Sequence, residues 1–195
     1  MQRAGNKLKV NVLFSIILPM AIAILFIIID QTVKTIFRVK YGMTGEYTVI
    51  KGFFSFAPTY NEGAAYGVLK GKAWAQDFFI ALTSVALIMF FVFFYLIKPY
   101  NFVAKYGVAL MISGTIGNFI DRVSMRKVVD MFKITVGGKD VFGVFNVADV
   151  CLCVGVALVV IHFLFIDEDA LLRSKKSKEK YKAKIREKYY GNENE

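Results

Sequence analysis

The chain contains 195 residues and carries a formal net charge of +10, and 56% of its residues are hydrophobic, 15% aromatic and 21% charged. Soluble domains are about 45–50% apolar and about 25% charged. This composition therefore excludes a mostly disordered chain or a coiled coil and argues against a soluble enzyme. The length predicts one domain. Because the apolar residues gather in long uncharged runs, we expect an integral membrane protein.

Four apolar runs are long enough to cross a bilayer, whose core of about 30 Å takes about 20 helical residues. They cover about 12–29, 78–97, 102–120 and 147–166. The third run reaches full length if Lys105 snorkels to the membrane surface. Lipid offers no partners to backbone polar groups, so each run is predicted to be a helix. We expect the first to be retained, since it is longer than a signal-peptide core and no A-x-A site follows.

The distribution of basic residues predicts the orientation. Four spans place both termini on one face, and that face receives 14 of the 25 Lys and Arg residues. This excess predicts cytoplasmic termini and makes 30–73 and 121–146 outward-facing segments. We expect a membrane domain at 1–167 and a basic cytoplasmic tail at 168–195, which touches anionic lipid. Nucleic-acid binding is disfavoured, because the aromatic residues lie in the membrane runs rather than among the basic ones.

The outward-facing segments contain strand-like patterns. Residues 47–50 are aromatic or β-branched and residues 53–56 are mostly aromatic, and Lys51-Gly52 separates them, so two short strands with a turn are predicted. Residues 133–136 and 141–145 flank a Gly-Gly pair, which is a hairpin signal. The predicted fold class is therefore an all-α membrane protein of four transmembrane helices with a small outward-facing β-sheet and loop region.

Four carboxyl groups are expected near the outer membrane face: Asp30, Asp121, Asp130 and Asp149. Carboxylates at membrane depth are costly and indicate function by default. A simpler role is a helix cap or a partner for a cation, such as Lys34 for Asp30 or Arg122 for Asp121. Asp130 follows two β-branched residues and has no evident capping role.

Two carboxylates in a partly dry site share one proton, so that one acts as a base toward water and the other as an acid toward a carbonyl. This is the chemistry of peptide hydrolysis, but spacing alone leaves other classes open. A proton-coupled membrane carrier is the main alternative, since it uses similar carboxylates. A Ser–Lys peptidase and a structural adaptor are two further ones. The single histidine, His162, and the absence of H-E-x-x-H disfavour a metal site, and we expect no cofactor.

Several sequence blocks, in order, resemble the prolipoprotein signal peptidases (signal peptidase II), which are integral-membrane aspartic peptidases of bacteria. The blocks are DQTVK at 30–34, NEGAAYG at 61–67, GNFIDR at 117–122, VVD at 128–130 and FNVAD at 145–149. The sequence departs from the family pattern at four places, one of which is Thr115-Ile116 where a small Gly-Ala-type pair is usual. Val33 replaces Ser or Thr, Arg126 replaces Gly, and Met131 replaces a Phe.

The resemblance implies that Asp130 and Asp149 are the catalytic pair. It implies substrate-binding or site-shaping roles for Asp30, Lys34, Asn61, Gly63, Asn118, Asp121, Arg122 and Asn146. The implied activity is cleavage of a prolipoprotein just before its diacylglyceryl-modified Cys, without metal or cofactor, at the outer face of the bacterial cytoplasmic membrane. The implied partners are these lipidated substrates and membrane lipid, with no nucleic acid.

Overall fold

The computed structural model describes residues 11–63, 71–72 and 74–190. Within these residues, the helices are α1 (Leu18–Ile36), α2 (Ala75–Leu96), α3 (Phe102–Met125), α4 (Val147–Ile161) and α5 (Lys175–Tyr190). Short π-helical segments extend α1 at both ends, at Leu13–Ile17 and Phe37–Tyr41, and α4 at His162–Ile166. Residues 64–67 of the predicted NEGAAYG block lie outside the described part of the chain.

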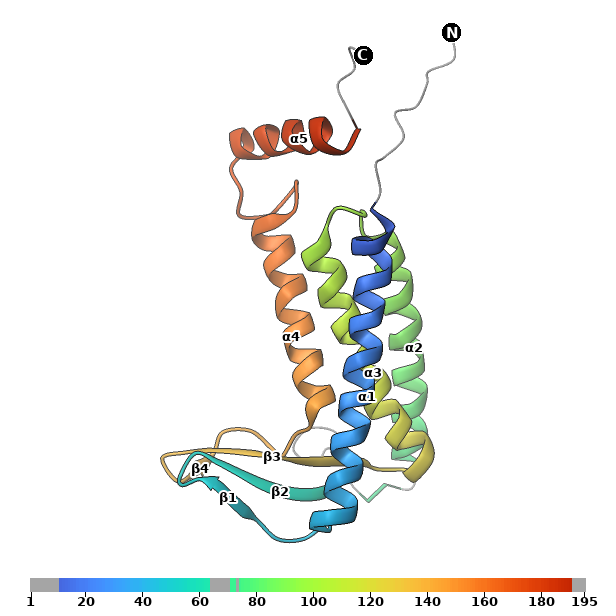
Figure 1. The fold of residues 1–195 in the computed structure, drawn as a ribbon, viewed down its shortest axis with the longest axis vertical. Helices are drawn as coiled ribbons and strands as arrows, with labels where there is room; N and C mark the ends of the chain where they lie inside the picture. The colour runs from blue at the N-terminus through green and yellow to red at the C-terminus, as the bar shows by residue number, and fades with distance from the viewer. Residues whose placement is uncertain (1–10, 64–70, 73, 191–195) are drawn as a thin grey trace.

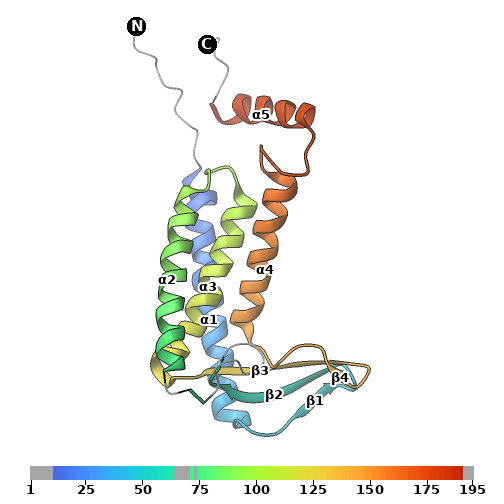
Figure 2. The same ribbon diagram turned by 180° about the vertical axis from the view of Figure 1, so that it is seen from behind.

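Helices α1 to α4 run side by side, with the sheet at one end of the bundle and α5 across the other (Figures 1 and 2). Each is long and apolar enough to cross a membrane. Their surfaces expose large apolar side chains, such as Ile24, Leu25, Ile88 and Met89. A surface of this kind suits lipid rather than water. The membrane fold that the sequence predicts is confirmed.

Helix α3 is the centre of the bundle. Over its most apolar stretch 56% of the residues are buried, against 11–22% in the other three helices. It packs closely on α4 because small residues face each other: a Cβ atom on Gly114 would collide with the carbonyl oxygen of Ala148. Gly107 and Gly155 make a second close approach of the same two helices. Small residues at such crossings allow tight packing where lipid gives no hydrophobic driving force.

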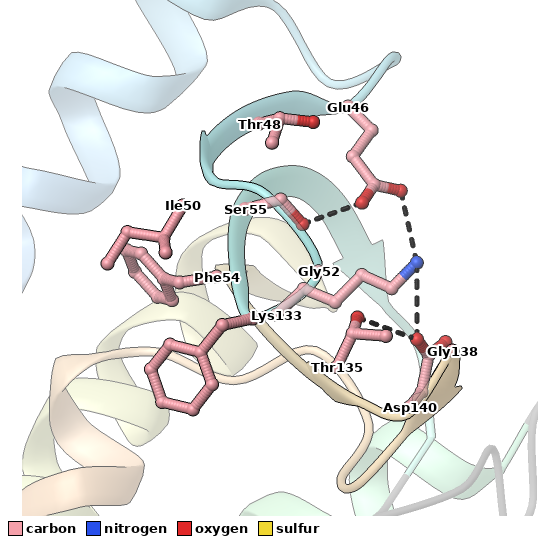
Figure 3. A pocket seen from close by; sticks show the side chains of 11 residues that line it. Glu46, Thr48, Ile50, Gly52, Phe54, Ser55, Lys133, Thr135, Gly138 and Asp140 are labelled. Carbon is pink, nitrogen blue, oxygen red and sulfur yellow. Dashed lines mark hydrogen bonds and ion pairs between the residues drawn. The ribbon is translucent and has the colours of Figure 1, made fainter.

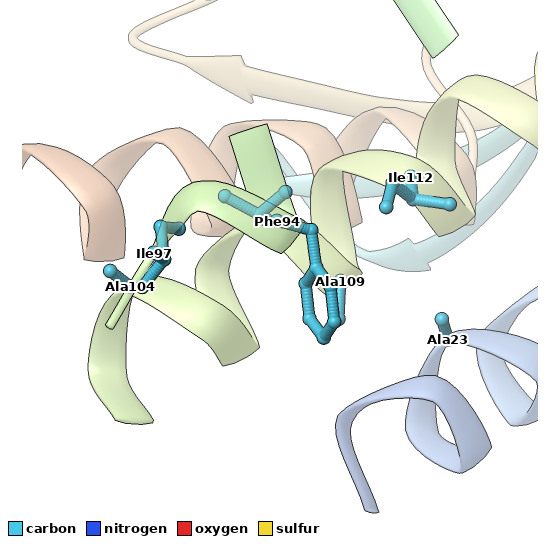
Figure 4. Close-up of a cluster of buried hydrophobic side chains, with 7 residues drawn as sticks. Ala23, Phe94, Ile97, Ala104, Ala109 and Ile112 are labelled. Atoms are coloured by element: carbon cyan, nitrogen blue, oxygen red, sulfur yellow. The ribbon is translucent and has the colours of Figure 1, made fainter. Parts of the chain in front are cut away.

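An apolar cluster fills the bundle toward the end that carries α5 (Figure 4). Phe94 and Ile97 from the end of α2 pack with Ala104, Ala109 and Ile112 of α3 and with Ala23 of α1. All six side chains are buried. These side chains form an apolar core between α1, α2 and α3.

The sheet has the strand order β1-β2-β3-β4 with antiparallel neighbours throughout. Its described strands are β1 (Tyr47–Ile50), β2 (Phe54–Asn61), β3 (Val128–Val136) and β4 (Lys139–Asp140). The predicted Gly-Gly turn is confirmed, since Gly137 and Gly138 both have positive φ. A strand at 141–145 was a wrong prediction: only Phe145 bridges to Phe132, because β4 ends two residues after the turn.

The helices at the sheet end are longer than the apolar runs. The first helical segment continues to Tyr41 and α3 continues to Met125. Asp30 and Asp121 therefore lie inside helices, whereas hydropathy placed them after the helix ends. The carboxylates are tolerated in helices at this depth because Lys34 forms an ion pair with each of them.

Lys105 also departs from the prediction. Its side chain does not snorkel but is buried, with 4% of the residue exposed. The Nζ atom donates a hydrogen bond of 2.9 Å to the carbonyl oxygen of Phe94 and lies 4.3 Å from the centre of the Phe94 ring. Phe94 belongs to the last turn of α2, whose carbonyl groups lack partners within the helix. Lys105 satisfies one of them.

Candidate active site

Asp130 and Asp149 reach the same place from a strand and a helix. Asp130 is the third residue of β3, where it pairs with Thr59 of β2. Asp149 is the third residue of α4. The backbone amides of Met131 and Phe132 both donate to the carbonyl oxygen of Phe145. These two bonds hold β3 against the segment that leads into α4, and so bring the two carboxyl groups together.

Asn146 connects the two carboxyl groups. Its side-chain amide donates to Oδ1 of Asp130 at 2.7 Å. Its backbone N–H donates to Oδ2 of Asp149 at 3.1 Å, and its Oδ1 accepts from the backbone N–H of Asp149 at 2.9 Å. The last two bonds form a capping box at the start of α4. The sequence therefore fixes Asp149 through ordinary helix capping, and the same residue holds Asp130.

Two more asparagines complete the contacts of the pair. The amide of Asn61 donates to Oδ2 of Asp130 at 3.0 Å, and its Oδ1 accepts from the backbone N–H of Gly63. The amide of Asn118 donates to Oδ1 of Asp149 at 2.8 Å. Each carboxyl group thus has both oxygens occupied by directed donors. Asp130 is almost fully buried, whereas Asp149 is partly exposed, so the site opens on the Asp149 side.

Lys34 organises a second cluster beside the pair. Its Nζ lies 2.8 Å from Oδ2 of Asp30 and 3.0 Å from Oδ2 of Asp121, and it donates to Oδ1 of Asn118 at 3.0 Å. Lys34 and Asp30 are each 1% exposed and Asp121 is 2% exposed. Two carboxylates therefore share one ammonium group in a dry setting, where each is paired with the same cation. Because Lys34 fixes the oxygen of Asn118, the amide of Asn118 faces Asp149.

The two carboxylates of this cluster also hold backbone. Oδ1 of Asp30 accepts from the N–H of Ala148 at 2.9 Å, in the first turn of α4, where that N–H has no helical partner. Oδ2 of Asp121 accepts from the N–H of Val129, one residue before Asp130, at 3.1 Å. The cluster thus positions both elements that carry the pair.

Sequence reasoning did not single out two residues of this site. The amide of Gln31 donates to Asp30, to the carbonyl oxygen of Gly117 and to Asp121. A Cβ atom on Gly117 would lie 2.6 Å from Oδ2 of Asp30, so a larger residue would displace that carboxylate. Both residues belong to sequence blocks quoted above. The available signal was their position next to Asp30 and Asn118.

Arg122 behaves differently from the expectation that it pairs with Asp121. Asp121 pairs with Lys34 instead, because its side chain turns into the bundle. The Arg122 guanidinium lies over the ring of Phe79, 5.2 Å from its centre, and makes no ion pair within the described residues. Its charge is nevertheless close enough to interact with those of Asp149 and Asp130. Arg122 is thus a cation held beside the pair by an aromatic ring of α2.

The electrostatic setting favours a proton on the pair. Burial and the nearby carboxylate of Asp149 raise the pKa of Asp130 from 3.8 to about 7, against the opposing effect of the Asn61 and Asn146 donors. Like charges in a poorly solvated site disfavour a second ionisation. Near neutral pH the Asp130 carboxyl group is therefore about half protonated.

A separate pocket of about 240 Å³ lies on the sheet, away from the carboxyl pair (Figure 3). Lys133 crosses it between Glu46 and Asp140, with N–O distances of 3.0 and 3.4 Å, and the hydroxyl of Ser55 donates to Glu46. These contacts tie β2, β3 and β4 to the residue that precedes β1. Among the described residues, no three His, Cys, Asp or Glu side chains are grouped so as to hold a metal ion.

Comparison with known proteins decides the family. The family model described as signal peptidase (SPase) II matches residues 22–165. The chain belongs to the signal peptidase II family. The lipoprotein signal peptidase of Staphylococcus haemolyticus is 36% identical over 166 residues, which cover 85% of this chain and 98% of that protein. That of Lactobacillus gasseri is 33% identical, covering 78% of this chain and 95% of that protein.

A solved structure supports the same assignment. A bacterial membrane enzyme determined by the in meso method at 2.3 Å resolution has a TM-score of 0.72 and 33% identity, covering 82% of this chain and 93% of that chain. This signal peptidase II family member is therefore a multi-pass membrane protein of a protease family. The comparisons give no support to the carrier alternative.

Proposed function

We propose that this chain removes the signal peptide of prolipoproteins by cutting just before a diacylglyceryl-modified Cys, with Asp130 and Asp149 as the catalytic pair. The observation that carries the proposal is the linkage of both carboxyl groups through Asn146, next to a partly exposed opening at Asp149. Membership in the signal peptidase II family and the relatives named lipoprotein signal peptidase support the substrate class.

The proposed reaction needs one proton on the pair. The ionised carboxylate takes a proton from water as the water oxygen attacks the scissile carbonyl carbon, and the protonated carboxyl group donates to the carbonyl oxygen. The tetrahedral intermediate then collapses as a proton moves to the leaving nitrogen and the C–N bond breaks. The raised pKa of Asp130 supports Asp130 as the acid and the more exposed Asp149 as the base.

The surrounding groups have proposed roles that follow from their contacts. Asn146, Asn61 and Asn118 orient the carboxyl oxygens. Arg122 is a positive group next to the pair that suits the carbonyl oxygens of an extended substrate. The Lys34 cluster is a set of positioning residues, since it acts through Asn118 and through the backbone of Ala148 and Val129.

The arrangement also suits a lipidated substrate. The pair lies on β3 and in the first turn of α4, at the end of the bundle that carries the sheet (Figure 1). We propose that this end faces outward from the bacterial cytoplasmic membrane and that both termini are cytoplasmic, with the peptidase domain at 1–167 and the tail at 168–195. A signal-peptide helix would then lie in the bilayer beside the bundle, its lipid chains remaining in the membrane.

The test is cleavage of a synthetic diacylglyceryl-modified prolipoprotein peptide by the purified full chain in detergent. Mass spectrometry is expected to show a cut just before the lipidated Cys, with EDTA and a serine-directed reagent having no effect. Asp130→Asn and Asp149→Asn keep the side-chain size and are each expected to lower the rate by at least about 10³-fold. The same peptide without the lipid is the matched control.

Three results would overturn the proposal. Folded wild-type protein that leaves the peptide intact would exclude the activity on this substrate class. Normal cleavage by both Asn variants would exclude the Asp pair and favour a Ser–Lys peptidase that uses Lys34. Inhibition by EDTA would point to a metal.

A further inference from the structure

Helix α5 lies outside the part of the chain that the family model matches. It crosses the end of the bundle that is remote from the sheet, transverse to the four membrane helices (Figures 1 and 2). The helices end just below it, so α5 lies close to the level at which the membrane surface meets the bundle. The proposed peptidase site does not explain why a basic helix lies in this position.

One face of α5 is attached to the protein. Ile185 is 9% exposed, and the ring of Tyr189 stacks on Tyr100 with 5.1 Å between ring centres. Nζ of Lys182 lies 2.7 Å from Asp169. Tyr100 and Asp169 belong to the two segments that follow α2 and α4 at this end of the bundle. The spacing of three and four residues between Lys182, Ile185 and Tyr189 places them on one side of the helix.

The rest of α5 is strongly basic. Its sequence contains eight Lys and Arg residues and two Glu residues. Six of the basic side chains are exposed and form no ion pair with any described residue: Lys175, Lys176, Lys180, Lys184, Arg186 and Lys188. We call these six residues the α5 basic surface. The helix lacks an apolar face wide enough to insert into lipid, so its contact with a membrane would be electrostatic.

We propose that the α5 basic surface binds the headgroups of anionic phospholipid in the leaflet at this end of the bundle. A basic side chain near an anionic membrane surface contributes roughly a five-fold gain in binding. Charge complementarity and the flat position of the helix both support this partner. A single-stranded nucleic acid is a poorer fit, because Tyr189 is stacked within the protein and is not available to bases.

The experiment is hydrogen exchange of the full chain in nanodiscs, followed by mass spectrometry of peptides from 175–190. Nanodiscs of phosphatidylcholine are compared with nanodiscs containing about one third phosphatidylglycerol. We expect amide exchange in α5 to slow by about ten-fold with the anionic lipid. The difference is expected to shrink in about 0.5 M salt, where electrostatic attraction is screened over a few ångströms.

A variant with all six residues of the α5 basic surface changed to Gln is expected to lose the lipid-dependent difference. Gln is a good helix former, and far-UV circular dichroism checks that the helix is kept. The matched control changes exposed lysines at the sheet end to Gln, namely Lys40, Lys51 and Lys139. It is expected to keep the full difference.

Equal exchange of wild-type α5 in both nanodiscs would overturn the proposal, as would lipid-dependent protection that persists in the Gln variant. Protection of α5 by a short RNA in phosphatidylcholine nanodiscs, with no effect of phosphatidylglycerol, would replace lipid by nucleic acid as the partner. Cleavage activity is not part of the readout, so the result is independent of the proposed peptidase function.

Discussion

The bundle contains two buried lysines at opposite ends, and they have different partners. Lys34, near the sheet, is 1% exposed and contacts the carboxylates of Asp30 and Asp121 and the oxygen of Asn118. Lys105, near α5, is 4% exposed and contacts the backbone carbonyl and the ring of Phe94. Both lysines are removed from water, but only the first is connected to the carboxyl pair.

The difference shows that a buried charge in a membrane helix does not by itself mark a functional site. Lys105 serves the end of α2, where a cation meets the negative end of a helix dipole. Lys34 forms ion pairs with two carboxylates that hold the backbone beside Asp149 and Asp130. Lys34 is therefore assigned to the proposed catalytic site because of the residues that it contacts, and not because it is buried.

Lys34→Met is the strongest test of this contrast. It leaves two buried carboxylates without their cation, which typically costs about 3–5 kcal/mol of folding stability. It also frees Asn118, so the cleavage rate is expected to fall by about 10²-fold or more. Thermal unfolding in detergent and peptide cleavage measure the two effects.

The double variant Lys34→Met with Asp30→Asn is the control for folding, since it removes one of the uncompensated charges. We expect it to recover part of the stability while cleavage stays low. If the cleavage rate of Lys34→Met stays within about three-fold of the wild-type rate, Lys34 does not have the proposed positioning role.

The pH dependence of stability tests the proton on Asp130. Its pKa is about 7 in the folded protein and 3.8 in an ordinary setting, so the folded state holds a proton that the unfolded state has released between these values. This contribution is fully present below pH 3.8 and is lost as the pH rises through 7. Relative to Asp130→Asn, wild type is expected to lose up to about 1.4 kcal/mol per pH unit between pH 5 and 7.

Unfolding midpoints of both proteins at pH 5, 6, 7 and 8 provide the measurement, and parallel curves would contradict the raised pKa. Cleavage by wild type is also expected to fall as the pH rises above about 7, because the pair then loses the proton that acts on the carbonyl.

Lys105→Met is expected to have a smaller and purely structural effect. The carbonyl oxygen of Phe94 loses its donor, which costs about 1–2 kcal/mol, while Met fills much of the same volume. Cleavage is expected to remain within about two-fold of wild type. A loss of cleavage comparable to that of Lys34→Met, in protein that is still folded, would show that Lys105 also supports the catalytic site.

Arg126→Gly is expected to have the smallest effect. Arg126 ends α3 in the left-handed region, with φ of 60°, and is the one non-glycine residue with positive φ within the described residues. Glycine adopts this conformation without steric cost, although the variant loses an exposed contact with Asp77. A rise in Tm of about 2 °C is expected, with unchanged cleavage. A fall in Tm would show that the contact with Asp77 outweighs the strain.

Several elements of the structure can be predicted from the sequence because the patterns that specify them are local. Uncharged runs of about 20 residues dictate membrane helices, and the Gly137-Gly138 pair dictates the turn between β3 and β4. Asn146 and Asp149 are three residues apart in front of an apolar run, which is the pattern of a capping box. These features need no knowledge of the rest of the chain.

Other features could not be read in this way. Hydropathy ended the first helix before Asp30 because a charge in lipid is costly. The helix continues because Lys34, one turn away, compensates that charge and the backbone N–H of Ala148, in another helix, donates to the Asp30 carboxylate. Asp121 was assigned to its neighbour Arg122, but the helix turns the two side chains in different directions. Gln31 was not singled out because its partners, Gly117 and Asp121, are about 90 residues away in sequence.

The sequence by itself determined that the chain spans a membrane, that its acids gather at the end with the sheet, and that its blocks resemble signal peptidase II. Periodicity, length and residue type are local properties, and they suffice for these conclusions. Only the tertiary structure decided which groups meet: that Asn146 links Asp130 to Asp149 and that Lys34 rather than Arg122 neutralises Asp121. The physical reason is that buried polar groups must find partners wherever the fold provides them, and those partners come from distant parts of the chain.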